Sequence, residues 1–120
     1  MTIFHVTLEV ADPQGAIWEP VQALADTGAT FTKIPRNVLQ RLGIVSTATS
    51  EAVIADGRRI QRQLGEARLR IDGQQVPDIV TFGEPGEEPL LGSHTLEAAR
   101  LAVDPVNQRL ISVPIFEMRA

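Results

Sequence analysis

Ala23-Leu24-Ala25-Asp26-Thr27-Gly28-Ala29-Thr30 is the stretch on which the interpretation of this chain depends. Its first residues are apolar and favour a β-strand that starts near Val21 and delivers the carboxylate of Asp26 directly into a turn of small residues. Gly28 has no side chain and lets another chain approach the backbone closely. Taken alone, an Asp-Thr-Gly triplet is weak evidence, because it occurs by chance in roughly a few per cent of chains of this length. An ordinary turn is therefore the alternative.

The bulk properties of the chain predict a single folded domain over residues 1–120. The chain has 120 residues, of which 43% are hydrophobic and 22% charged, so one apolar core is expected and a second catalytic lobe does not fit. A net charge of -4 argues against partners such as nucleic acid or a membrane surface, because phosphate groups require clustered Lys and Arg. The absence of cysteine excludes disulfides, thiol catalysis and cysteine-ligated zinc. The first residues do not resemble a secretion signal, so a cytoplasmic location is expected.

Periodicity predicts a mostly β chain with two short helices. Alternating apolar residues favour strands, and Asp-Gly pairs suit the positive-φ positions of tight hairpin turns. The expected strands are residues 2–10, residues 21–26, the short segment 31–34, the arms of two hairpins with turns at Asp56-Gly57 and Asp72-Gly73, and one or two strands over 109–118. One helix is expected from Pro35 to the residue before Gly43, and another from Thr95 to Leu101.

The order of these features resembles that of the retropepsin-like (clan AA) aspartic proteases, and in particular their bacterial single-domain members. The resemblance extends from about Pro20 to Val113. Its matching features are the motif around Asp26, a flap hairpin with its tip at Ala55-Asp56-Gly57-Arg58, the triplet Leu90-Leu91-Gly92, and the stretches 31–36 and 103–107. This combination is far more specific than either triplet alone. It implies an all-β fold, a retropepsin-like acid protease closed barrel with one or two short helices and a flap hairpin.

The resemblance also implies an endopeptidase activity and a set of site residues. In this family two copies of the aspartate, here Asp26, lie about 3 Å apart and share one proton. The ionised acid acts as general base on a water, and the protonated acid hydrogen-bonds the scissile carbonyl, so neither a metal nor a cofactor is required. Thr27 would brace the two loops, and Gly28 would present a backbone carbonyl to the substrate. Family position places the substrate-binding residues at Leu24, Ala29, Thr30, Ile54, Ala55, Asp56, Gly57 and Leu90.

A homodimer is expected, because the chain has only one such triplet and the second acid must come from outside it. A two-fold interface places identical loops face to face. The segments Ile3 to Leu8 and Val113 to Met118 are expected to form much of that interface. The hairpin around Asp56-Gly57 is expected to close over a peptide or protein substrate that binds as an added strand.

Several residues depart from the best-known viral pattern. Thr30 and Ser93 stand where those enzymes have an Asp and an Arg that form an ion pair, and a weaker hydrogen bond between the two hydroxyls is the expected substitute. The chain has no tyrosine, so a pepsin-style flap tyrosine is missing. Arg58 and Arg59 near the flap tip suggest a preference for acidic side chains in the substrate. His5 and His94 are expected at the surface or the edge of the core, and their separation argues against a metal site.

Two other functions are compatible with parts of the pattern. The spacing Asp26-Thr27-Gly28-Ala29-Thr30 also fits a phosphate loop of the actin and sugar-kinase ATPases, but those folds need two large lobes and a second phosphate loop. The other alternative is a catalytically silent peptide-binding homodimer with the retropepsin fold, because a fold does not guarantee its chemistry.

Overall fold

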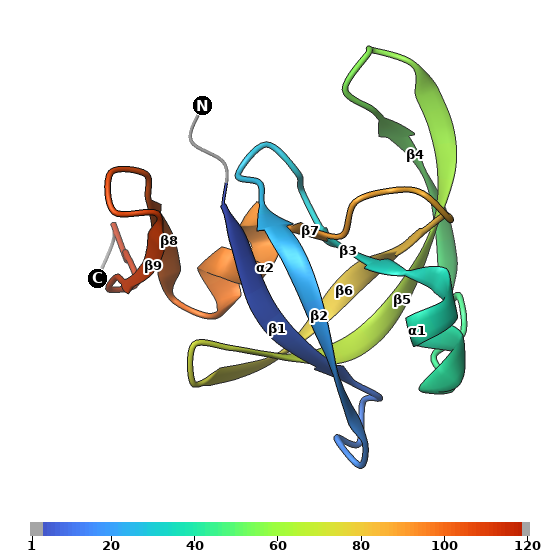
Figure 1. The fold of residues 1–120 in the computed structure, drawn as a ribbon, viewed down its shortest axis with the longest axis horizontal. Helices are drawn as coiled ribbons and strands as arrows, with labels where there is room; N and C mark the ends of the chain where they lie inside the picture. Colours follow the sequence, from blue (N-terminus) through green and yellow to red (C-terminus); the bar gives the residue numbers. More distant parts are fainter. Residues whose placement is uncertain (1–3, 119–120) are drawn as a thin grey trace.

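The computed structural model describes residues 4–118 and shows a β-barrel with two short helices and a separate hairpin (Figure 1). In chain order the elements are β1 (His5–Ala11), β2 (Trp18–Ala25), β3 (Thr32–Pro35), α1 (Arg36–Arg41), β4 (Ala48–Val53), β5 (Arg59–Ile71), β6 (Gln74–Gly83), β7 (Leu90–Leu91), α2 (Ser93–Ala98), β8 (Leu101–Asp104) and β9 (Arg109–Ser112).

Six strands close the barrel. Neighbouring strands follow the order β1-β2-β7-β3-β6-β5, and β1 also pairs with the far half of β5, so the ring returns to its start. Strand β4 pairs only with the near half of β5 and extends beyond the ring, whereas β8 and β9 form their own two-stranded sheet. The predicted all-β closed barrel of the retropepsin type, with two short helices, is therefore confirmed in its architecture.

The barrel interior holds the main apolar core. Alternate residues of each strand point inward, and the side chains with no exposed surface include Leu8, Val10, Ile34, Leu69 and Leu91. Helices α1 and α2 bring Leu39 and Leu96 onto the same cluster. Burial of these side chains in one cluster is what fixes the strands that flank the Asp26 loop.

The two Asp-Gly pairs make different turns, although both hairpins are present as predicted. Asp72 and Gly73 have φ of 49° and 80°, which is the two-residue turn that joins β5 to β6. In the first hairpin only Gly57 has a positive φ, of 87°. This turn is longer, since the amide of Ile54 donates a hydrogen bond of 3.0 Å to the carbonyl of Arg58. This longer turn forms the tip of the hairpin made by β4 and the near half of β5. We call this hairpin the flap, after the segment predicted from the sequence.

Three predicted boundaries are wrong. The second strand begins at Trp18 and includes Pro20, which is tolerated because β7 pairs β2 only at Leu24 and Ala25, so that Pro20 has no neighbour on that side. The second helix ends at Ala98, and Leu101, which apolar periodicity assigned to the end of that helix, is instead the first residue of β8. The terminal strand ends at Ser112, and residues 113–118 form none. Predicted strand residues 2 and 3 lie outside the described residues.

None of the helices within residues 4–118 is both long enough and apolar enough to cross a membrane.

Candidate active site

Asp26 follows directly on β2 and is held by the strand beside it. Strands β2 and β7 run parallel, with Leu24 opposite Leu90 and Ala25 opposite Leu91. The amide of Asp26 donates to the carbonyl of Leu91 at 2.9 Å, so the aspartate is fixed to the second motif of the sequence pattern, Leu90-Leu91-Gly92. The two motifs that sequence analysis connected by resemblance thus lie side by side.

The Asp26 loop is a tight turn that orients the carboxylate. The amide of Gly28 donates to Oδ1 of Asp26 at 2.9 Å, and the amide of Ala29 donates to the carbonyl of Asp26 at 3.1 Å. Asp26 is half-buried, while Thr27 and Gly28 are exposed. Within residues 4–118 the Thr27 hydroxyl has no hydrogen-bond partner. The hydrogen bond from the Gly28 amide fixes the direction of the Asp26 carboxylate.

The loop continues onto the start of α2, and Gly92 makes this approach possible. The amides of Ser93 and His94 donate to the carbonyls of Ala29 and Thr30 at 2.8 and 3.0 Å. A Cβ at Gly92 would lie 2.5 Å from the carbonyl carbon of Phe31, so only glycine fits. The predicted hydrogen bond between the side chains of Thr30 and Ser93 is wrong, because backbone groups make the connection instead.

A buried polar chain lies beneath the loop and provides a connection that sequence analysis missed. The hydroxyls of Thr32 and Thr95, both with no exposed surface, are 2.6 Å apart, and Thr95 donates to Oδ2 of Asp78 at 2.7 Å. The amide of Gly92 donates to the Thr32 hydroxyl at 3.1 Å. At the outer end, Nδ1 of the exposed His94 lies 2.6 Å from Oδ1 of Asp78. This Thr32–Thr95–Asp78 chain links β3, α2 and β6 behind the Asp26 loop.

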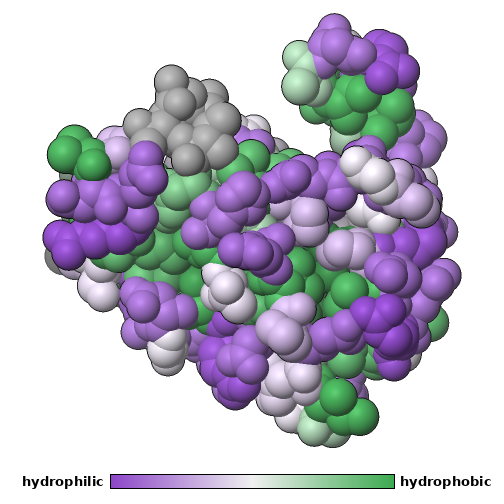
Figure 2. All heavy atoms as spheres, in the orientation of Figure 1, coloured by the Kyte–Doolittle hydropathy of each residue, from purple (hydrophilic) through white to green (hydrophobic). Residues whose placement is uncertain are grey.

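The predicted substrate-binding residues lie in two groups. Leu24, Leu90 and Ala29 are half-buried beside Asp26, and Thr30 is exposed at the end of the same loop. The second group, Ile54 to Gly57, is at the flap tip, where only Ile54 is half-buried. Figure 1 shows the Asp26 loop, between β2 and β3, and the flap at the same end of the barrel. In Figure 2 the flap stands clear of the body of the molecule. The structure therefore brings the first group together with Asp26 and leaves the flap tip open.

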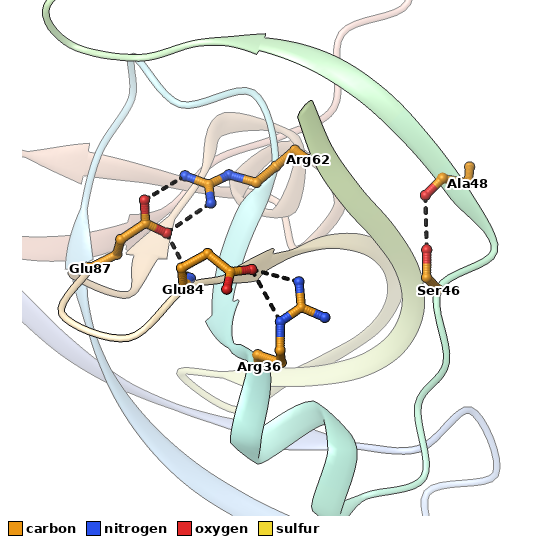
Figure 3. A network of polar contacts seen from close by, with 6 residues as sticks. All are labelled: Arg36, Ser46, Ala48, Arg62, Glu84 and Glu87. Atoms are coloured by element: carbon orange, nitrogen blue, oxygen red, sulfur yellow. Dashed lines mark hydrogen bonds and ion pairs between the residues drawn. The ribbon is translucent and has the colours of Figure 1, made fainter. Parts of the chain in front are cut away.

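The base of the flap is anchored to the loop before β7 by an ion pair. Arg62 of β5, whose side chain is 8% exposed, donates two hydrogen bonds of 2.8 and 2.9 Å to Glu87 (Figure 3). Glu87 also accepts the amide of Glu84 at 2.7 Å. The Arg62 guanidinium lowers the pKa of Glu87 to about 2. The sequence did not predict this role for Arg62, because its partner Glu87 lies 25 residues away and no local spacing connects the two.

The flap arginines are already paired within the flap. Arg58 lies 2.6 Å from Asp56, and Arg59 lies 2.6 Å from Glu51. A backbone hydrogen bond from Arg58 and its side chain lower the pKa of Asp56. These exposed pairs balance the charges on which the predicted acidic preference relied.

No group of three or more His, Asp or Glu side chains within residues 4–118 is arranged to hold a metal ion. His5 is exposed and pairs with Glu88 at 2.6 Å, in keeping with its predicted surface position. Two surface hollows lie elsewhere, one lined by Pro77, Ile79 and His94 and the other by Ile71, Gln108 and Leu110, and neither is lined by the Asp26 loop or the flap tip.

The retropepsin-like aspartic proteases are defined by a closed barrel with an Asp-Thr-Gly loop. In these proteins a second motif, two apolar residues followed by glycine, braces that loop. The chain belongs to this class: residues 18–98 match the family described as "gag-polyprotein putative aspartyl protease". Among solved structures it is similar to the Simian Foamy Virus (mac) protease, with a TM-score of 0.55, 19% sequence identity, and coverage of 78% of this chain and 92% of the viral one. At that identity the similarity shows a shared fold. No curated protein matches the sequence. Membership of this family excludes the ATPase alternative.

Proposed function

We propose that the chain is an endopeptidase that hydrolyses peptide bonds with a pair of Asp26 carboxylates, one from each subunit of a homodimer. The observation on which the proposal rests is the Asp26 loop. Its carboxylate is oriented by the Gly28 amide, its backbone is fixed to Leu91, and the adjoining Thr27 and Gly28 are exposed. A reacting group held this rigidly at a surface is suited to chemistry on a bound chain.

The proposed reaction is general acid–base hydrolysis. Two Asp26 carboxyls about 3 Å apart share one proton, because like charges at that separation cannot both ionise. The ionised carboxylate removes a proton from a water, which attacks the scissile carbonyl carbon. The protonated carboxyl hydrogen-bonds the carbonyl oxygen and stabilises the tetrahedral intermediate. Proton transfer to the leaving amide nitrogen then releases both peptide products.

The proposed dimer is supported by two exposed features of the single chain, the Thr27 hydroxyl and the apolar side chains of residues 113–118. The Thr27 hydroxyl is exposed at the loop and is free to brace the same loop of a second copy. Residues 113–118 expose Ile115, Phe116 and Met118 by 64%, 78% and 89%. Several large apolar side chains on one short segment favour burial in an interface. This segment, together with the start of β1 at His5, is the proposed contact between subunits, whereas Leu8 at the end of the predicted segment is buried in the barrel core.

The flap is proposed to close over the substrate. Strand β4 has no fully buried residue and pairs only with β5, so few contacts oppose its movement. An extended peptide would bind between the flap tip, Ile54 to Gly57, and the half-buried Leu24, Ala29 and Leu90 beside Asp26, with Thr30 at the end of the same loop. The Arg62–Glu87 pair would hold the flap base in place while the tip moves.

Cleavage of a blocked-peptide library tests the proposal. The wild type, Asp26→Asn and the matched control Asp72→Asn are compared from about pH 4 to 7, which spans the titration of a shared-proton dyad. Asp72 lies in the β5–β6 turn with φ of 49°, a conformation that Asn tolerates, so its variant should retain activity. Loss of cleavage in Asp26→Asn alone is the expected result. Sedimentation of the wild type reports the dimer.

A catalytically silent peptide-binding homodimer is the second candidate. It is favoured by one observation, that the Asp26 loop lacks the side-chain ion pair of the viral pattern and is braced by backbone bonds to Ser93 and His94. If the wild type is dimeric, binds library peptides and cuts none of them at any pH, this second function replaces the first.

A further inference from the structure

Lys33 is the chain's only lysine, among ten arginines, and it lies next to the proposed site. It was not among the predicted site residues. Its neighbours on β3, Thr32 and Ile34, have no exposed surface and face the interior, so Lys33 faces the opposite side of the strand.

The strand register places Lys33 in one row with two predicted subsite residues. Lys33 is opposite Leu90 in the β3–β7 pairing, and Leu90 is opposite Leu24 in the β2–β7 pairing. Residues directly opposite each other on adjacent strands share a face of the sheet. The row Lys33, Leu90, Leu24 therefore lies along one face and ends two residues before Asp26.

The surroundings of Lys33 hold its charge in a partly buried position. Its stem lies against Gly83, where a Cβ would be only 3.1 Å from Cγ of Lys33. Burial lowers the pKa of the Lys33 ammonium, while the nearby charges of Glu87 and Asp26 oppose that shift. The described structure gives Lys33 no ion pair. Two of its three acidic neighbours are engaged in ion pairs elsewhere, Glu87 with Arg62 and Glu88 with His5, and the third is Asp26.

We propose that Lys33 determines specificity by binding an acidic side chain, Asp or Glu, of an extended peptide lying between the Asp26 loop and the flap. This inference rests on the proposed function for the position of the peptide. A carboxylate that reaches Lys33 would replace the lost hydration of the ammonium, whereas an amide of the same shape would leave the charge uncompensated. Because Arg58 and Arg59 already have carboxylate partners, the acidic preference belongs to Lys33 and not to the flap tip.

Two-fold symmetry extends the inference to both halves of the substrate. A homodimer has two copies of Lys33, one in each half of the cleft. Acidic residues should therefore be favoured at two positions of the peptide, related by symmetry about the scissile bond.

Binding measured without cleavage tests this directly. In the Asp26→Asn background, blocked octapeptides carry Glu, Gln or Lys at each position in turn, and affinities are measured by calorimetry. We expect Glu to bind about tenfold more tightly than Gln at one position and at its symmetry mate, as for a partly desolvated charge pair. Adding Lys33→Met should reduce this ratio to within about twofold, and Lys33→Glu should reverse it in favour of the Lys peptide. The matched control Arg58→Met should keep the wild-type ratio.

The single lysine gives a second readout that requires no variant. Reductive methylation with ¹³C labels only Lys33 and the terminal amine and keeps the charge of both. The Lys33 methyl signal should shift on addition of the Glu peptide and not on addition of its Gln counterpart.

The outcomes separate this inference from the proposed function. A wild type that cleaves Glu and Gln peptides equally at every position refutes the role of Lys33 and leaves the protease standing. Selective Glu binding through Lys33, without cleavage by the wild type, upholds the role of Lys33 and refutes the protease. If no peptide binds the Asp26→Asn dimer and the wild type cleaves none, both are overturned.

Discussion

Replacing Thr95 by valine should destabilise the fold by about 3 kcal/mol, because the two side chains are nearly isosteric and only hydrogen bonds are lost. Thr95 has no exposed surface, and its hydroxyl has a single proton, which it donates to Asp78 at 2.7 Å. The contact of 2.6 Å with Thr32 must therefore be a bond donated by Thr32. Valine at position 95 leaves the Asp78 carboxylate short of one donor and the Thr32 hydroxyl without its acceptor.

The magnitude follows from these two losses. A bond to a charged acceptor contributes about 1.5–3 kcal/mol, and an unsatisfied buried hydroxyl adds about 1 kcal/mol. Urea unfolding, followed by the fluorescence of the only tryptophan, Trp18, measures the sum. With a slope of about 2 kcal/mol/M, the midpoint should fall by roughly 1.5 M. Because a dimer's stability depends on concentration, all variants are compared at the same one.

Thr49→Val is the matched control, because Thr49 is exposed on β4 and should change stability by less than about 0.5 kcal/mol. A Thr95→Val protein that unfolds at the wild-type urea concentration would refute the reasoning. The Thr32–Thr95–Asp78 chain would then contribute nothing to the support of the Asp26 loop.

Three further predictions concern the site and its supports. Gly92→Ala should cost about 3 kcal/mol or more and abolish cleavage, because φ of -93° and ψ of 169° suit alanine but its Cβ would lie 2.5 Å from Phe31; normal stability and activity would contradict this. Glu87→Gln should lower the free energy of unfolding at pH 7 by about 2 kcal/mol, after discounting for partial exposure. Since the pKa of Glu87 is lowered from 4.5 to about 2, that difference should be complete above about pH 5 and disappear as the pH falls through about 2; urea midpoints across this range check it, and a constant difference would refute it. Lys33→Met should be as stable as the wild type or more stable at pH 7. The reason is that the pKa of Lys33 is lowered in the folded chain, so protonation favours the unfolded chain, and this penalty disappears as the pH rises above the folded pKa. A clear loss of stability in Lys33→Met would show that the charge supports the fold.

Local sequence determined much of this protein. The Asp72-Gly73 turn, the apolar strand ending at Asp26 and the short helix after Pro35 each follow from the preferences of a few adjacent residues. The order of the Asp26 motif, the flap and Leu90-Leu91-Gly92 was sufficient to predict the barrel and the family. The predicted element boundaries are wrong where contacts between residues distant in the sequence determine where a strand begins. Pro20 lies within a strand because β7 is too short to reach it, and Leu101 opens a strand because β9 pairs with it.

Only the tertiary structure decided how the site is supported and charged. Thr32 and Thr95 are 63 residues apart in the chain, and no local pattern indicates that their hydroxyls meet. The sequence drew attention to Arg58 and Arg59, yet folding gives both a carboxylate partner and leaves Lys33 beside the Asp26 loop. The physical reason is that turn and strand preferences act over a few bonds. The burial of Lys33 and the pairing of Arg62 with Glu87 depend instead on which distant strands and loops the closed barrel brings together.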